Sequence, residues 1–289
     1  MKFAGVGLVM LAAVCWGVSG GIADILMAKG WDPIVISLYR GAVGFICFLA
    51  WLLFHFRQNW TSSARLFIWS LLAGIGVAGN FAFYFLSIQA SSIAVAATLM
   101  YTAPVFVLLI SFLFRIERST WFKWGCIAGV LIGIALLTGV YNTETISVSF
   151  LGAAMGLAAG LSYALFIFGF KNASSLGKPQ TALTIAFFSL CLILFLFADK
   201  DEAAAVLASS DIGWFLLLGI LGAGISFIVY MIGIRKTAPA TASMVAMVEP
   251  VTASLFGVLL LGDHLTTIQI LGMIVILATI TTLSVKQSD

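Results

Sequence analysis

The chain has 289 residues, of which 62% are hydrophobic and 9% are charged, and its formal net charge is +3. Because soluble domains carry about 25% charged residues, this composition excludes an ordinary water-soluble fold and requires lipid to cover the apolar surface. The small and dispersed positive charge also gives no basis for nucleic-acid binding.

Ten apolar segments are long enough to be transmembrane helices, since about 20 apolar residues cross the hydrocarbon core. In chain order they lie near residues 4–27, 33–55, 66–88, 92–114, 121–140, 149–171, 179–198, 212–234, 240–261 and 266–285. The first is longer than the roughly 7 to 15 apolar residues of a signal peptide, so we interpret it as a span. Polar clusters such as 58–63, 141–147 and 199–211 are interpreted as connecting loops. The sequence therefore predicts an all-α integral membrane protein.

The basic residues gather in alternate connections, which predicts the orientation of the spans. With the N-terminus inside, Lys29 and Lys200 lie outside, Arg40 lies within a span, and the other eleven of the fourteen lie inside: Lys2, Arg57, Arg65, Arg115, Arg118, Lys123, Lys171, Lys178, Arg235, Lys236 and Lys286. Because Lys and Arg prefer cytoplasmic loops, we expect both termini in the cytoplasm and the protein in a bacterial-type inner (plasma) membrane.

A weak internal repeat divides the chain in two. An offset of 146 or 147 residues aligns Gly76 with Gly222, Tyr84 with Tyr230, Ala96 with Ala242, Pro104 with Pro250, Glu117 with Asp263, and Trp16-Gly17 with Tyr163-Ala164. Five spans per copy is an odd number, so the second copy must be inverted in the membrane. The predicted units are residues 1–140 and 149–285, an arrangement typical of secondary transporters that bind substrate near the midplane.

In this arrangement the chain resembles the drug/metabolite transporter superfamily, in its ten-helix branch with two EamA domains. The resemblance rests on Trp16-Gly17, Pro33 followed by Arg40, Pro104, Ser162-Tyr163-Ala164, Glu249-Pro250 and Leu261-Gly262-Asp263, where the family more often has Leu-Gly-Glu. It covers nearly the whole chain. It implies efflux or exchange of small metabolites, commonly amino acids and related compounds, through a central pocket.

Two charged residues lie deep in predicted spans, where a charge costs about 2.5 to 3.5 kcal/mol on insertion scales and therefore needs a partner or a water-filled cavity. Glu249 is a candidate proton-linked switch, and Arg40 is its counter-ion or the group that holds a substrate carboxylate. The alternative is a static pair that joins two helices. Asp24, near the outer end of its span, is either a solvated rim carboxylate or part of an outer gate.

Seven aromatic and amide residues also lie within spans rather than at the interfaces, where lipid-belt aromatics belong. They are candidate substrate-binding residues together with Arg40 and Glu249: Trp16, Tyr39, Asn80, Tyr84, Tyr101, Tyr163 and Tyr230. Tyr84 shares a helix face with Asn80, and Tyr230 shares one with Ser226, because each pair is four residues apart. Hydrogen bonding between helices is the alternative for each of them.

Pro104 and Pro250 each free a carbonyl one turn earlier, so they are candidate hinges or fixed kinks that shape a cavity. Gly125, Gly129 and Gly133 have the small-xxx-small spacing of helix contacts, within one chain or between the subunits of a homodimer.

No catalytic residue, metal or cofactor is expected. The two histidines, His55 and His264, lie near loop edges, and no nucleophile has a plausible base. We expect a small-molecule substrate, amino acids first and cationic drugs or amines second, with protons as a candidate coupling ion. A channel is a further alternative, although isolated mid-span charges and an inverted repeat favour alternating access.

Overall fold

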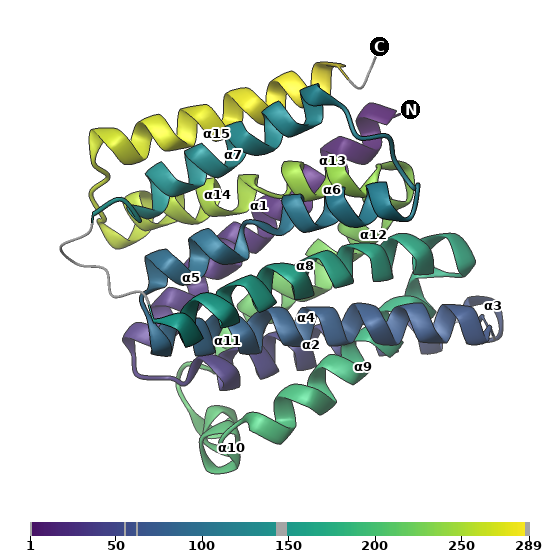
Figure 1. Cartoon of the computed structure of the whole chain (residues 1–289). Coiled ribbons are helices and arrows are strands. Elements are labelled where there is room, and N and C mark those ends of the chain that lie inside the picture. The colour runs from purple at the N-terminus through teal and green to yellow at the C-terminus, as the bar shows by residue number, and fades with distance from the viewer. Residues whose placement is uncertain (1, 55, 62, 143–148, 287–289) are drawn as a thin grey trace.

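The computed structural model describes residues 2–54, 56–61, 63–142 and 149–286, and every regular element within these ranges is helical. His55 and the centre of the connection between the two predicted units lie outside the described residues. The elements (Figure 1) are α1 (Lys2–Ala28), α2 (Pro33–Phe54), α3 (Phe56–Asn59), α4 (Ala64–Ala90), α5 (Ile93–Met100), α6 (Ala103–Leu113), α7 (Trp121–Thr138), α8 (Phe150–Leu176), α9 (Pro179–Phe197), α10 (Lys200–Ala208), α11 (Ile212–Gly219), η1 (Ile220–Ile225), α12 (Ser226–Lys236), α13 (Pro239–Val245), α14 (Val248–Phe256), η2 (Gly257–Leu261) and α15 (Thr267–Lys286).

The described residues contain ten helical stretches that are long and apolar enough to cross a membrane, which confirms the predicted number of spans. Seven are single helices, whereas the fourth joins α5 and α6, the eighth joins α11, η1 and α12, and the ninth joins α13, α14 and η2. The segments η1 and η2 are π-helices, which are often found at functional sites.

One connection that we interpreted as a loop contains a helix. The carboxylate of Asp199 accepts hydrogen bonds from the backbone N–H groups of Asp201 and Glu202, both at 2.9 Å, and so caps the first turn of α10. An aspartate at this position satisfies N–H groups that have no partner within the helix, and negative charge is favourable there. The expectation of an irregular loop over 199–211 was therefore wrong for α10.

The helices run side by side in one bundle (Figure 1). We call the end that holds the start of α1, α3 and the close of α15 the terminal end, and the end that holds α10 the distal end. Helices α4 and α8 pack along each other through the middle, and α7 pairs with α15 along one edge. Small residues permit these contacts, since a Cβ on Gly76 would lie 2.6 Å from the Phe166 amide nitrogen.

The predicted glycine contact surface on α7 packs within the chain. A Cβ on Gly133 would lie 2.9 Å from the carbonyl oxygen of Gly272, and one on Gly129 would lie 2.8 Å from the Thr279 hydroxyl, so both glycines press α7 onto α15. A Cβ on Gly125 would meet no atom within 4 Å. A homodimer contact on this face stays a prediction.

The fourth and ninth spans are interrupted at positions that the sequence offset pairs. Helix α5 ends at Met100 and α6 begins at Ala103, whereas α13 ends at Val245 and α14 begins at Val248. Pro104 and Pro250 are the second and third residues of the helices that follow. Proline lacks an N–H group and is tolerated in the first turn. Each proline therefore begins a new helical piece rather than bending a continuous one.

Candidate functional site

A cavity of about 290 Å³ reaches from the middle of the bundle toward the distal end. Helices α1, α2, α4 and α14 provide most of its walls, with residues of the fourth span and one residue of α11. Its polar and charged lining residues are Trp16, Asp24, Ser37, Arg40, Asn80, Tyr84, Tyr101 and Glu249. Seven of the sequence-predicted site residues therefore meet at one cavity, although they come from four separate spans and the break of a fifth.

Arg40 lies on α2 at the wall of this cavity. Its Nε donates a hydrogen bond to the carbonyl oxygen of Gly222 at 3.1 Å, and its guanidinium carbon lies 5.1 Å from the ring centre of Phe81. Gly222 belongs to the π-helix η1, and a Cβ there would lie 2.6 Å from Ser19 Cβ and 2.9 Å from Arg40 Nε, so a side chain at this position would displace both neighbours. The π-helix thus places a backbone acceptor against Arg40 and holds one edge of the guanidinium.

Glu249 lies in the first turn of α14, directly after the break in the ninth span. Arg40 and Glu249 influence each other electrostatically, but no oxygen of Glu249 lies within 4.0 Å of the guanidinium nitrogens. The Tyr163 hydroxyl is near the carboxylate without meeting the geometry of a hydrogen bond. A static Arg40–Glu249 ion pair is therefore absent from the described part of the chain in this conformation.

The other lining residues are distributed along the cavity. Asp24 is exposed near the distal end of α1, whereas Tyr101 is buried at the break between α5 and α6. Asn80 donates from Nδ2 to the carbonyl oxygen of Ala159 at 3.1 Å, so its amide also joins α4 to α8. Tyr84 follows Asn80 by one turn and lines the same wall.

Three predicted site tyrosines do not line the cavity in this conformation. Tyr39 donates to the Ala203 carbonyl oxygen at 2.7 Å and packs on Phe215, which ties α2 to α10 and α11. Tyr163 and Tyr230 are buried beside the cavity, at 3% and 1% exposure. Their roles in binding stay predictions, as do the hinge roles of the two prolines.

Tyr163 and Tyr230 belong to a group of six aromatic rings, which we call the aromatic layer: Trp16, Tyr163, Phe166, Phe170, Phe227 and Tyr230. The Trp16 ring lies 5.1 Å from that of Tyr230 and 5.2 Å from that of Phe227, between centroids. Since Trp16 also lines the cavity, the aromatic layer begins where the cavity ends.

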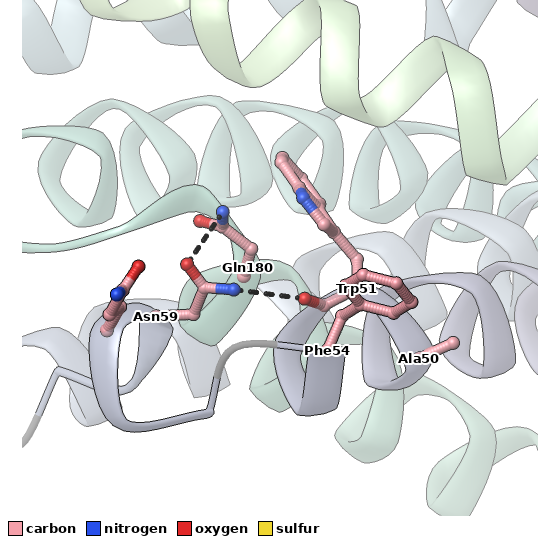
Figure 2. A pocket seen from close by; sticks show the side chains of 6 residues that line it. Ala50, Trp51, Phe54, Asn59 and Gln180 are labelled. Carbon is pink, nitrogen blue, oxygen red and sulfur yellow. Dashed lines mark hydrogen bonds between the residues drawn. The ribbon is translucent and has the colours of Figure 1, made fainter.

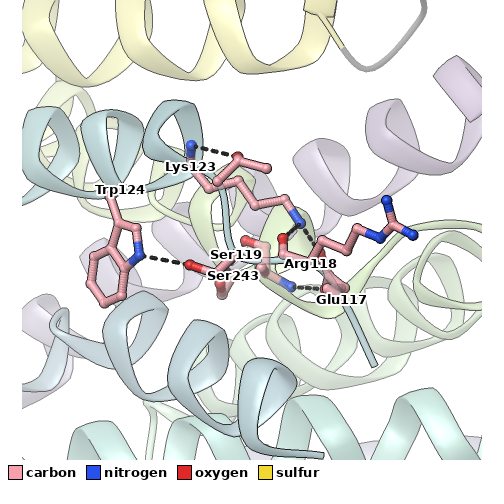
Figure 3. A network of polar contacts seen from close by, with 8 residues as sticks. Glu117, Arg118, Ser119, Lys123, Trp124 and Ser243 are labelled. Carbon is pink, nitrogen blue, oxygen red and sulfur yellow. Dashed lines mark hydrogen bonds and ion pairs between the residues drawn. The ribbon is translucent and has the colours of Figure 1, made fainter. Parts of the chain in front are cut away.

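Beyond the aromatic layer, the terminal end is closed by polar contacts. Glu117 accepts a hydrogen bond from the Ala240 backbone N–H at 2.9 Å and pairs with Lys123 at 2.5 Å (Figure 3). Lys171 donates to three carbonyl oxygens at the C-terminal end of α12, those of Ile234, Arg235 and Thr237 at 2.8 to 3.1 Å. The Glu117 carboxylate and the Lys171 ammonium therefore pair with backbone N–H and C=O groups at helix ends, which lack partners within their own helices.

At the distal end, polar contacts join the α1–α2 connection to α10 and α11. Lys29 forms an ion pair with Asp211, Trp31 donates to the same carboxylate at 3.0 Å, and the Asp32 N–H donates to Glu202 at 2.6 Å. The hydrogen bonds from Lys29 and Trp31 lower the pKa of Asp211 from its usual 3.8. These contacts lie beside the cavity and leave its mouth at Asp24 exposed.

Two of the hollows that exceed the central cavity in volume lack its charged groups. One of about 400 Å³ lies at the terminal end, where Asn59 donates to the Trp51 carbonyl oxygen and accepts from Gln180 (Figure 2). These amides hold α3 against α9. The other, of about 660 Å³, is an apolar groove between α4, α6 and α8, lined by exposed side chains such as Phe114 and Leu161. Its exposed apolar lining suits contact with lipid.

Several residues that the structure brings to the site have no clear functional signal in the sequence. Phe81 is next to Asn80 in a run of apolar residues, and nothing in its context separates it from a lipid-facing side chain. Gly222 was found only as a repeat match, and its contact with Arg40 depends on the π-helix. Glu117 is also a repeat match. Its position in the connection between two spans is the only sequence feature that points to its contacts at the terminal end.

Comparison with known proteins identifies a matching family and several similar proteins. The sequence profile of the EamA-like transporter family matches residues 3–139 and again residues 150–285. The uncharacterized inner membrane transporter YicL of Salmonella typhimurium is 26% identical over 285 residues, covering 96% of this chain and 93% of that protein. The threonine/homoserine exporter RhtA of Escherichia coli is 26% identical over 275 residues, covering 94% and 88%. One solved crystal structure shares the fold, with a TM-score of 0.71 at 17% identity over 95% of each chain.

Proposed function

The chain belongs to the EamA-like transporter family, and on this premise we propose that it exports or exchanges amino acids and related small metabolites by alternating access. In this proposal the two predicted units rock about the central cavity, which faces the distal end here and the terminal end in a second state. The charge distribution supports placing the termini in the cytoplasm of a bacterial-type inner membrane, so the distal end faces outward.

One observation carries the substrate class: a cation and an anion lie at the same cavity without pairing with each other. Arg40 uses one N–H on Gly222, and guanidinium offers five donors in a fork that suits a carboxylate. An amino acid brings a carboxylate for Arg40 and an ammonium for Glu249 or Asp24. The volume of about 290 Å³ lies at the lower limit of about 300 to 1,000 Å³ for small-ligand pockets, which favours a small metabolite.

A cationic amine is the second candidate substrate. Asp24 and Glu249 both line the cavity and would attract it, whereas Arg40 would repel it. The two candidates differ in their need for Arg40. An amino acid requires this residue, and an amine is transported as well or better when its charge is removed.

Glu249 is the coupling residue in this proposal. A carboxylate deep in a span is favourable only with a partner, so its protonation is linked to what occupies the cavity. The charged and titratable groups around it come from several helices: Asp24 on α1, Arg40 on α2, Tyr84 on α4, Tyr101 at the α5–α6 break and Tyr163 on α8. Proton release from Glu249 is expected to accompany substrate exchange.

The first experiment is a thermal-shift screen of the purified protein over amino acids, amines, sugars and nucleosides, followed by counterflow of the hits in proteoliposomes. A carrier shows uptake that is accelerated by substrate on the far side, and a channel does not. Replacing Arg40 with Gln is expected to reduce amino-acid counterflow by about 30-fold or more, since truncating one partner of a buried, hydrogen-bonded charge pair costs about 2 kcal/mol or more. Arg65→Gln, at the exposed start of α4, is the matched control.

Replacing Glu249 with Gln tests the coupling. We expect this variant to bind substrate and to lose the pH dependence of its counterflow. Full transport with the wild-type pH profile would remove Glu249 from the coupling step. Stronger transport of amines by Arg40→Gln would favour the second candidate.

A further inference from the structure

Three polar atoms in the aromatic layer have no hydrogen-bond partner among the described residues: Trp16 Nε1, the Tyr163 hydroxyl and the Tyr230 hydroxyl. Each of these side chains is at least 96% buried. Leaving a buried donor or acceptor without a partner costs about 1 to 3 kcal/mol. Three such atoms in neighbouring side chains therefore disfavour the observed conformation and need a reason to be retained.

The aromatic layer lies between the cavity and the closed terminal end. On α1 the cavity is lined from Trp16 toward the distal end, so the ring contacts of Trp16 mark its inner limit. Phe170 lies within two turns of the terminal end of α8, and Tyr230 lies within two turns of that end of α12. The rings thus occupy the space through which a substrate would have to pass to reach the terminal end.

The predicted repeat relates the unpaired groups to residues that line the cavity. Tyr230 is aligned with Tyr84, and Tyr163 is aligned with Trp16. Tyr84 lines the open cavity, whereas Tyr230 is buried. Alternating access rocks one inverted repeat against the other around a fixed site, and we infer that aligned residues of the two predicted copies exchange their environments as it does so. By this relation Tyr230 becomes a cavity residue in the state that opens to the terminal end.

We propose that the aromatic layer is the closed terminal half of the substrate pathway, whose indole N–H and two tyrosine hydroxyls bind the polar groups of the amino-acid substrate when that half opens. The inference rests on the alternating access proposed above. In the observed state the three groups lack partners, and substrate and water supply them in the second state. The aromatic layer therefore blocks passage in the observed state, and its three unpartnered groups favour the change to the second state.

This assignment has a signature that a packing role would not produce. Removing an unpaired buried hydroxyl takes away a polar group that disfavours the observed state, so Tyr230→Phe should keep or raise the thermal stability. The Tyr163 hydroxyl also lies near the Glu249 carboxylate, so Tyr163→Phe is compared by its counterflow. The same changes remove a substrate contact from the second state and should slow counterflow about tenfold. Tyr39→Phe is the matched control, because its hydroxyl is bonded to Ala203. It should lower the melting temperature, and it serves as a control for stability alone.

The experiment measures melting temperature in detergent and counterflow in proteoliposomes for the three variants. Unchanged counterflow in both Tyr163→Phe and Tyr230→Phe would overturn the proposal, as would a melting temperature of Tyr230→Phe that falls as it does in Tyr39→Phe. A second arm does not depend on the substrate. Tyr230→Cys, or Phe170→Cys if the first does not fold, is treated with a water-soluble thiol reagent from the terminal side, with the wild-type protein as the background.

Labelling of the new cysteine from that side is expected and shows that the aromatic layer opens. If labelling occurs but no amino acid is transported, the proposed substrate is wrong and the pathway assignment stands. If amino acids are transported and neither cysteine is labelled, the aromatic layer is not part of the pathway.

Discussion

The two predicted halves carry similar residues in different surroundings. Tyr84 lines the cavity and Tyr230 is buried without a hydrogen-bond partner for its hydroxyl. Glu117 binds Lys123 and the Ala240 N–H, whereas its aligned residue Asp263 is exposed and its carboxylate has no partner within the described ranges. Under the alternating access proposed above, this difference is one of conformation, and each predicted half carries residues for either state.

The helices that begin the two halves also contact the interrupted spans at different places. A Cβ on Gly17 of α1 would lie 2.5 Å from the carbonyl oxygen of Glu249, after the break in the ninth span. On α8 the corresponding tight contact is at Gly160, where a Cβ would lie 3.0 Å from the carbonyl oxygen of Met100, before the break in the fourth span. The position aligned with Gly17 is Ala164, so the second half already has a side chain there.

The largest expected effect comes from replacing Gly17 in the first half with alanine, the residue at the aligned position of the second half. Gly17→Ala places a methyl group against backbone atoms of α14, which cannot move away as a flexible side chain would, so overpacking costs about 1 to 3 kcal/mol or more. We expect a clear fall in melting temperature and loss of transport. Gly7→Ala on the same helix is the control, since its Cβ would meet no atom within 4 Å, and a similar loss in both variants would contradict the prediction.

A smaller effect is expected from the aligned acidic residues. Glu117→Gln weakens contacts that hold the terminal end closed, and hydrogen bonds to charged groups contribute about 1.5 to 3 kcal/mol. The closed state should lose population, so a cysteine at the buried position Val245 should be labelled about ten to a hundred times faster from the terminal side.

Asp263→Asn provides the comparison for Glu117→Gln. Because the Asp263 carboxylate is exposed and unpartnered within the described residues, the labelling rate at position 245 should not rise. Equal acceleration by both variants would mean that Glu117 does not act as a closing contact.

The smallest effect is expected at the distal ion pair. Lys29 and Trp31 lower the pKa of Asp211 below 3.8, so the stability that this carboxylate contributes is present above that pH and is lost as the pH falls through the lowered value. The Lys29 side chain is 42% exposed, and exposed pairs contribute little. Asp211→Asn should lower the melting temperature slightly at pH 7 and flatten its decline below about pH 4. An unchanged acid profile would contradict this.

The spans and the charged cavity residues could be predicted from the sequence because each has a local cause. Hydropathy predicts helices in lipid, and a lone Arg40 or Glu249 in an apolar run indicates a cavity. Pro104 and Pro250 predicted hinges or kinks in the fourth and ninth spans, whereas the structure has an interruption just before each proline, and the residues that end the preceding helices could not be read from the chain. The π-helix at Gly222 has no sequence signal, because it is a small change in backbone winding that packing determines.

The separation of cavity and aromatic layer could not be predicted either. Trp16, Tyr84, Tyr163 and Tyr230 look alike in sequence, each a polar aromatic residue within a span. Which of them lines the cavity depends on which end is closed, and a sequence with two similar halves is compatible with both. The helix α10 could have been found, because Asp199 followed by Asp201 and Glu202 is a capping pattern.

The pairing of α7 with α15 sets an order of assembly during synthesis. The ribosome adds about 5 to 20 residues per second, so α7 leaves it about 7 to 30 s before its partner is complete. During that interval the groove at Gly129 and Gly133 faces lipid or the insertion machinery. Synthesis of α15 therefore completes the packing of α7, and a nascent chain cut before residue 267 should leave α7 exposed to degradation.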